Sequence, residues 1–202
     1  MRVPKRRILS LAGGTIWLVV AAAGFATISL VFVGTPIAKT SLTGVIALAA
    51  VLLGIAITSV RAASKLPGIL PPVTEEERGI LRHVAQTTVA EVIGLAIVNG
   101  ICIVYRQFAL IAPLDVLVVG LHFIPLARFL GVPRYYVMGA LFCVVSVVTL
   151  VFIPQSALVG HAPAQAVVPG LACSVVVWFV AAGNLRQVFQ MVREQQTTAL
   201  SI

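Results

Sequence analysis

Long apolar stretches separated by short polar breaks run along the whole chain. Apolar residues dominate six stretches of similar length, at 8–33, 42–60, 84–105, 110–127, 135–153 and 166–185. A helix of about 20 residues crosses a hydrocarbon core about 30 Å thick. The pattern therefore predicts an all-α, polytopic membrane protein, a bundle of six transmembrane helices that forms a single domain over residues 1–202.

Turn-forming residues mark the breaks between these stretches. They are Gly34-Thr35-Pro36, Leu66-Pro67-Gly68 with Pro71-Pro72, Gly131-Val132-Pro133, and the segment from Pro154 to Pro163. Each break is too short to hold a second domain. After the second break, Thr74 followed three residues later by Glu77 has the pattern of a capping box. The third helix is expected to begin there, with Glu75 to Arg82 solvated ahead of the membrane.

Composition strengthens the membrane interpretation. The chain is 60% hydrophobic and 10% charged, with a mean hydropathy of +1.10, and a soluble domain of 202 residues cannot bury that much apolar surface. The net charge of +8 does not indicate nucleic acid, because the Lys and Arg residues sit at the ends of the apolar stretches. The lipid bilayer is the expected partner, and no nucleic acid is expected.

The distribution of basic residues predicts the orientation. Alternate breaks place twelve of the 14 basic residues on one side: Arg2, Lys5, Arg6, Arg7, Arg61, Lys65, Arg78, Arg82, Arg128, Arg134, Arg186 and Arg193. The other side holds only Lys39 and Arg106. Because cytoplasmic loops carry the excess of Lys and Arg, both termini are expected in the cytoplasm, N-in and C-in, in the bacterial cell membrane.

Two ionisable residues lie deep inside the predicted spans. Glu91 follows Arg82 by about 14 Å of helix, and His122 precedes Arg128 by about 9 Å, so their depths agree within about one helical turn. The short connection between the third and fourth spans makes these helices antiparallel neighbours. Glu91 and His122 are therefore expected to approach each other, directly or through water, because a buried ionisable group needs a partner.

Further polar residues extend this pair into two facing stripes. His83, Thr87 and Glu91 recur every four residues and the line drifts toward Asn99, while His122 shares its face with Asp115. The candidate substrate or proton pathway thus comprises Glu91, His122, Asp115, Asn99 and Thr87. Pro125 removes a hydrogen bond from the carbonyl of Leu121, beside His122.

A structural interpretation of the same residues stays open. Glu91 can act as hydrogen-bonded glue to Thr87 or Thr88, and His122 as a neutral packing residue. For Asp115, an interfacial ion pair with Arg106 is the favoured alternative.

The cysteines and the remaining polar residues do not form a recognisable catalytic or metal-binding motif. The three cysteines, Cys102, Cys143 and Cys173, lie apart within apolar stretches, so no metal site and no cofactor are expected. No hydrolase triad, phosphate loop or dinucleotide glycine pattern occurs, so no catalytic residue is assigned and a non-enzymatic role is favoured. His161 is expected to be a solvated loop residue, and Gly183 with Asn184 to mark the end of the last helix.

Small residues at helical spacing predict close helix contacts. Ala50, Gly54 and Thr58 form such a face on the second span, and Gly139, Cys143 and Ser146 on the fifth. The first face is a candidate for pairing two copies of the chain as a homo-oligomer.

One segment carries a family resemblance. Gly120-Leu121-His122-Phe123-Ile124-Pro125-Leu126-Ala127, followed by Pro133-Arg134-Tyr135-Tyr136-Val137 and Gly139, resembles small uncharacterised bacterial multi-span membrane proteins. The resemblance implies a membrane location and six helices, and it implies no activity.

Three functions are compatible with these patterns. The buried Glu/His pair favours a small transporter or permease coupled to protons or cations. The small size and the lack of catalytic motifs favour a non-catalytic membrane partner or assembly protein. A membrane-embedded enzyme acting on a lipid-like substrate, with the pair as acid and base, is the third.

Overall fold

The computed structural model describes residues 5–33, 35–64 and 74–200, and these residues form an all-α bundle. The long helices are α1 (Lys5–Val33), α2 (Pro36–Ser64), α3 (Glu75–Val104), α4 (Ile111–Leu130), α5 (Pro133–Phe152) and α6 (Ala164–Leu200). A short helix, η1 (Phe108–Leu110), precedes α4, and a small hairpin of β1 (Leu158–Val159) and β2 (Ala162–Pro163) precedes α6. The six predicted helices are confirmed, and each is long and apolar enough to cross a membrane.

Local sequence signals set several helix ends. The predicted capping box is present: the Glu77 amide donates to Thr74 Oγ1 at 3.1 Å, and the Thr74 amide donates to Glu77 Oε2 at 3.1 Å. Helix α4 ends at Leu130, and the following Gly131 has a φ of 63°, a left-handed conformation that a residue without a Cβ adopts most readily. Helix α5 begins with Pro133 at its first position, where the missing N–H costs nothing.

The predicted end of the last helix is wrong. Helix α6 does not stop at Gly183 and Asn184 but continues to Leu200, and Asn184 is completely buried. The neighbouring helices enclose this turn, so tertiary packing overrides the local helix-ending tendency of Gly and Asn. Pro125 likewise lies inside α4 and does not end it.

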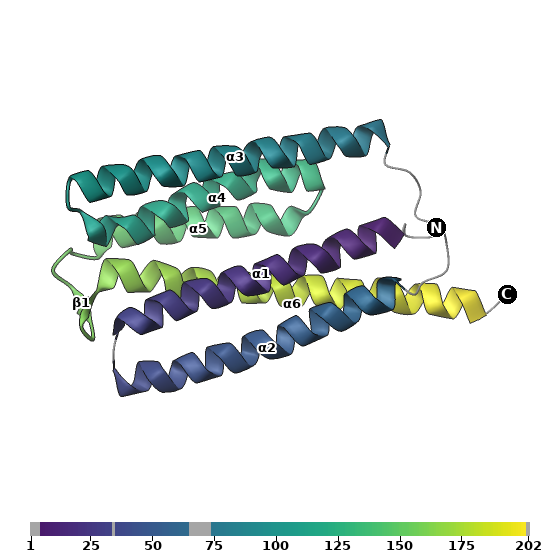
Figure 1. Ribbon diagram of the computed structural model, residues 1–202, viewed down its shortest axis with the longest axis horizontal. Helices are drawn as coiled ribbons and strands as arrows, with labels where there is room; N and C mark the ends of the chain where they lie inside the picture. The colour runs from purple at the N-terminus through teal and green to yellow at the C-terminus, as the bar shows by residue number, and fades with distance from the viewer. Residues whose placement is uncertain (1–4, 34, 65–73, 201–202) are drawn as a thin grey trace.

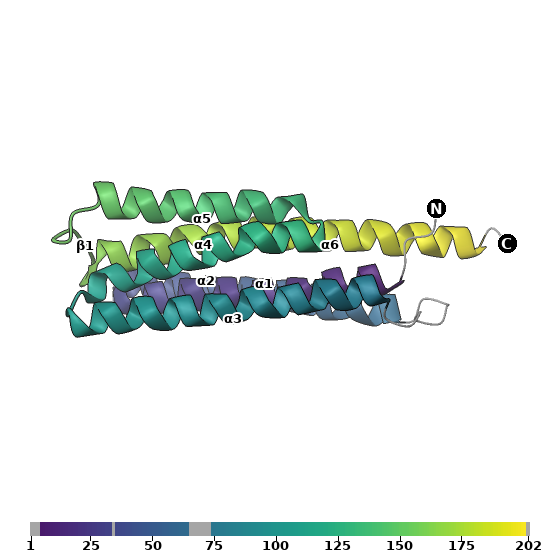
Figure 2. The same cartoon turned by 90° about the horizontal axis from the view of Figure 1, so that it is seen from above.

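The helices lie side by side in an up-and-down bundle (Figures 1 and 2). Helix α1 packs against α2 and α6, and α4 packs against α5. Helix α3 packs mainly against α4, at the periphery of the bundle. The beginning of α1 and the end of α6 lie at the same end, where α6 extends beyond the other helices (Figure 1).

The main core joins α1, α4, α5 and α6. Its fully buried side chains include Val19, Val116, Met138, Phe142 and Val177. In contrast, α3 has a single buried residue, Cys102. The attachment of α3 therefore depends on one seam with α4 and not on the core.

The predicted small-residue face of the fifth span is an internal contact. The Gly139 and Gly120 backbones meet where α5 and α4 cross, so a Cβ built at Gly139 would lie 2.7 Å from the Gly120 carbonyl oxygen. Two turns along, the Ser146 hydroxyl donates to the Pro113 carbonyl at 2.6 Å. These contacts hold α4 and α5 so close together that only glycine fits where their backbones cross.

The corresponding face of the second span is not an internal contact. Ala50, Gly54 and Thr58 are all exposed, and a Cβ built at Gly54 meets nothing within 4 Å. The homo-oligomer that this face suggests stays a prediction.

These two glycines give a matched stability test. Gly139→Ala should lower the free energy of unfolding by about 1–3 kcal/mol, because its methyl group overpacks the α4–α5 crossing. Gly54→Ala should be neutral or slightly stabilising, because the methyl group enters open space and alanine favours the helix. Unfolding in mixed detergent micelles measures both, and equal effects of the two substitutions would contradict the described crossing.

Candidate functional site

The seam between α3 and α4 contains all five predicted site residues. The helices run antiparallel, and contacts recur along the whole seam. The His83 ring stacks on Phe129 with centroids 4.7 Å apart, and a Cβ built at Gly94 would lie 3.1 Å from Val118. The stretch from His83 to Asn99 covers roughly 24 Å of α3. We call this set of contacts the α3–α4 seam.

Glu91 and His122 face each other near the middle of the seam. Glu91 Oε2 lies 3.6 Å from His122 Nε2, and the exposed fractions of the two side chains are 19% and 8%. This distance is within the range of an ion pair and slightly longer than a hydrogen bond. The structure thus brings together the two residues on which the sequence analysis centred.

The other ring nitrogen of His122 contacts the backbone of α3. His122 Nδ1 lies 3.2 Å from the carbonyl oxygen of Thr87. A carbonyl oxygen only accepts hydrogen bonds, so this contact is a hydrogen bond when Nδ1 carries a proton. In that tautomer Nε2 is the ring nitrogen that faces Glu91. The imidazole ring of His122 therefore lies between a backbone acceptor and the Glu91 carboxyl group.

Asn99 and Asp115 form a second polar contact farther along the seam. The Asn99 amide donates to Asp115 Oδ1 at 2.7 Å and to the Leu95 carbonyl at 2.8 Å. The expected ion pair between Asp115 and Arg106 is wrong: among the described residues Arg106 has no ion pair, and it occupies a left-handed turn with φ of 55°. The partner that the structure shows for the Asp115 carboxylate is Asn99.

Thr87 takes part in the contact with His122 through its backbone carbonyl and not through its hydroxyl group. The hydroxyl donates within α3, with the His83 and Val84 carbonyl oxygens at 3.1 and 2.9 Å, and the Thr88 hydroxyl also donates to Val84 at 2.9 Å. Neither hydroxyl bonds Glu91, so the expected Thr–Glu glue is not the arrangement found. The contact that holds Glu91 is with His122 on the neighbouring helix.

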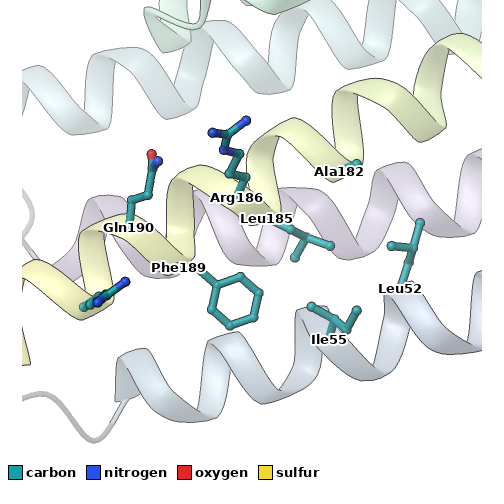
Figure 3. A pocket seen from close by; sticks show the side chains of 8 residues that line it. Leu52, Ile55, Ala182, Leu185, Arg186, Phe189 and Gln190 are labelled. Atoms are coloured by element: carbon teal, nitrogen blue, oxygen red, sulfur yellow. The ribbon is translucent and has the colours of Figure 1, made fainter.

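Two grooves flank α6 at the end of the bundle that holds the termini, and neither is lined by these five residues. One lies between α2 and α6, where Leu185 and Phe189 point toward Leu52 and Ile55 (Figure 3). The other lies between α5 and α6 and includes Arg134. Both grooves also include Arg186 and Gln190.

The sequence analysis missed the polar residues of this region. It assigned Arg134 and Arg186 only to orientation and Asn184 to a helix end. In the structure Asn184 is buried and its Oδ1 lies 3.5 Å from Arg134 Nη1. An amide inside the last apolar stretch was the available signal, because a buried polar side chain needs a partner from another helix.

The described residues contain no group of three His, Cys, Asp or Glu side chains that could hold a metal ion. Comparison of the chain with protein-family models, curated proteins and solved structures gives no match. Functional inference therefore rests on the seam and the grooves of this chain.

Proposed function

We propose that the protein is an integral membrane protein of the bacterial cell membrane, with both termini in the cytoplasm. Six apolar helices and the concentration of basic residues at one set of breaks support this arrangement. Helices α4 and α5 have 20 residues each, which gives about 30 Å and matches a hydrocarbon core. The bilayer then extends from the η1 end of the bundle to the α4–α5 turn.

Within that membrane we propose a small transporter coupled to protons or cations, with Glu91 and His122 as the proton-binding pair. The observation that carries this proposal is the position of His122 between the Thr87 carbonyl and the Glu91 carboxyl. Inserting a charged group into a membrane span costs roughly 2.5 kcal/mol or more, so an ionisable pair costs several kcal/mol. Such a pair is retained where function needs it.

The packing of α3 suggests how proton binding and movement are linked. With the shared proton present, Glu91 and His122 attract and the α3–α4 seam is closed. With the proton lost, the carboxylate and the Nε2 lone pair repel, and α3 shifts on α4 without disturbing the core, since it packs mainly on that one helix. Thr87, Asn99 and Asp115 extend the polar path along the same seam.

A second candidate function is a non-catalytic membrane partner. It is favoured by the mutual pairing of the seam residues and by the absence of all five from the two grooves that flank α6. In that case the seam is a polar clamp, a set of contacts that attaches α3 to α4, and protonation of Glu91 or His122 drives no transport.

Cysteine labelling tests the orientation. In a variant with Cys102, Cys143 and Cys173 replaced by Ala, a single cysteine at position 161 should react with a membrane-impermeant maleimide on intact cells. A cysteine at position 78 should react only after the cells are opened, because the N-terminal turn of α3 projects into the cytoplasm. Arg78 and His161 are both exposed, so burial does not limit either reaction. Labelling of position 78 from outside would contradict the orientation.

Glu91→Gln tests the transport proposal. Gln keeps the shape of Glu91 and its hydrogen bonding but cannot release a proton, so proton-coupled flux should fall at least about tenfold, while unfolding stability changes by less than about 1 kcal/mol. The measurement is the internal pH of proteoliposomes under an imposed pH gradient, with Na⁺, K⁺, Mg²⁺ and a panel of small solutes supplied in turn.

Glu76→Gln is the matched control, because Glu76 is an exposed carboxylate in the first turn of the same helix. This variant should keep the flux of the wild type. Wild-type protein that moves nothing in the panel, with a Glu91→Gln variant of equal stability at every pH, would reject transport and leave the polar clamp.

A further inference from the structure

The groove between α5 and α6, here called the α5–α6 groove, has one apolar wall and one cationic end. Its volume is about 680 Å³. The wall is formed by Val137, Met138 and Leu141 from α5 and by Val176, Phe179 and Val180 from α6. At the end nearest the termini the lining changes to Arg134, Arg186, Gln187 and Gln190. No acidic residue lines the groove.

Arg134 is positioned at this end by α6. Its guanidinium lies over Gly183, where a Cβ would come within 3.2 Å of Nη1, and Nη1 lies 3.5 Å from Asn184 Oδ1. The missing side chain of Gly183 thus provides the space, and Asn184 provides an anchor. A guanidinium has five N–H donors, and Asn184 Oδ1 takes only one of them, so Arg134 keeps donors for a further acceptor.

Arg186 faces the same end of the groove. Its side chain points away from α2, whereas Leu185 and Phe189 on the same helix point toward α2 (Figure 3). Neither Arg134 nor Arg186 is ion-paired with a carboxylate in the part of the chain that the structure describes. Two arginine side chains therefore line one groove, and within the described residues neither has a carboxylate partner.

The depth of this cationic end matches that of lipid headgroups. Arg134 lies in the first turn of α5, and the 20 residues of α5 match the thickness of the hydrocarbon core. The guanidinium groups thus lie at the boundary of that core, and the apolar wall runs inward from it. The N-terminal end of α5 adds a partial positive charge beside Arg134.

We propose that the α5–α6 groove binds an anionic phospholipid of the cytoplasmic leaflet. The phosphate group lies between Arg134 and Arg186, and one acyl chain lies along the apolar wall. Basic recesses between helices on the cytoplasmic side have the charge and depth that such headgroups need. This inference rests on the proposed membrane insertion and orientation and is independent of proton coupling at the α3–α4 seam.

Lipid affinity of the purified, delipidated protein in detergent micelles tests this inference. Phosphatidylglycerol should bind about 25-fold more tightly than phosphatidylcholine with the same acyl chains, because about 1 kcal/mol, or about fivefold, is expected for each of the two arginines near the headgroup. Arg186→Gln and Arg134→Gln should each reduce that preference about fivefold. Arg128→Gln, which removes an exposed arginine that lines neither groove, should leave it unchanged.

Three outcomes would overturn the inference: equal binding of the two lipids, an equal loss in all three arginine variants, or equal competition by soluble glycerol 3-phosphate, which would identify a free phosphate site. Glu91→Gln protein should keep the wild-type lipid preference, so a failure of proton coupling leaves this result intact. Recovery of the protein outside the membrane fraction would instead remove both proposals.

Discussion

In the proposed membrane setting the hydrocarbon layer offers no water to a polar group, and this constraint explains the polar contacts between the helices. A buried hydroxyl, amide or carboxylate must find its partner within the chain. Ser146 reaches the Pro113 carbonyl, Asn99 reaches Asp115, and Arg134 reaches Asn184, each across a helix pair. Lipid around the bundle would also weaken the hydrophobic attraction between helices, and the close approach of the α4 and α5 backbones at Gly120 and Gly139 would then provide van der Waals packing.

Polar contacts and close apolar packing are distributed unequally among the six helices. Helices α1, α4, α5 and α6 share a continuous apolar core, whereas α3 is attached through a polar seam to α4. The seam contains the ionisable side chains of Glu91, His122 and Asp115, whereas the core cluster is apolar. In the proposed transporter, α3 is therefore the element that can move, and the other helices are the frame against which it moves.

The number and type of helices could be predicted from the sequence, because apolar stretches of this length rarely adopt any structure other than a long helix. The proximity of Glu91 and His122 followed from depth and antiparallel pairing alone. The end of α6 could not be predicted, since Gly183 and Asn184 are kept helical by neighbours that no local pattern identifies. The same holds for the partner of Asp115, because the left-handed turn at Arg106 is decided by the connection to η1. Membrane insertion and orientation stay predictions.

The central proposal is that Glu91 and His122 share one proton, with Nδ1 of His122 donating to the Thr87 carbonyl. Nitrogen-15 NMR of protein labelled at its three histidines measures this directly, with His83→Gln and His161→Gln variants to assign the signals. The proposed shared-proton arrangement predicts a protonated Nδ1 for His122, because that nitrogen faces the Thr87 carbonyl oxygen. It also predicts that the Nε2 signal moves toward that of an unprotonated nitrogen when Glu91→Gln is introduced. An unprotonated Nδ1, or an Nε2 signal that Glu91→Gln leaves unchanged, would contradict it.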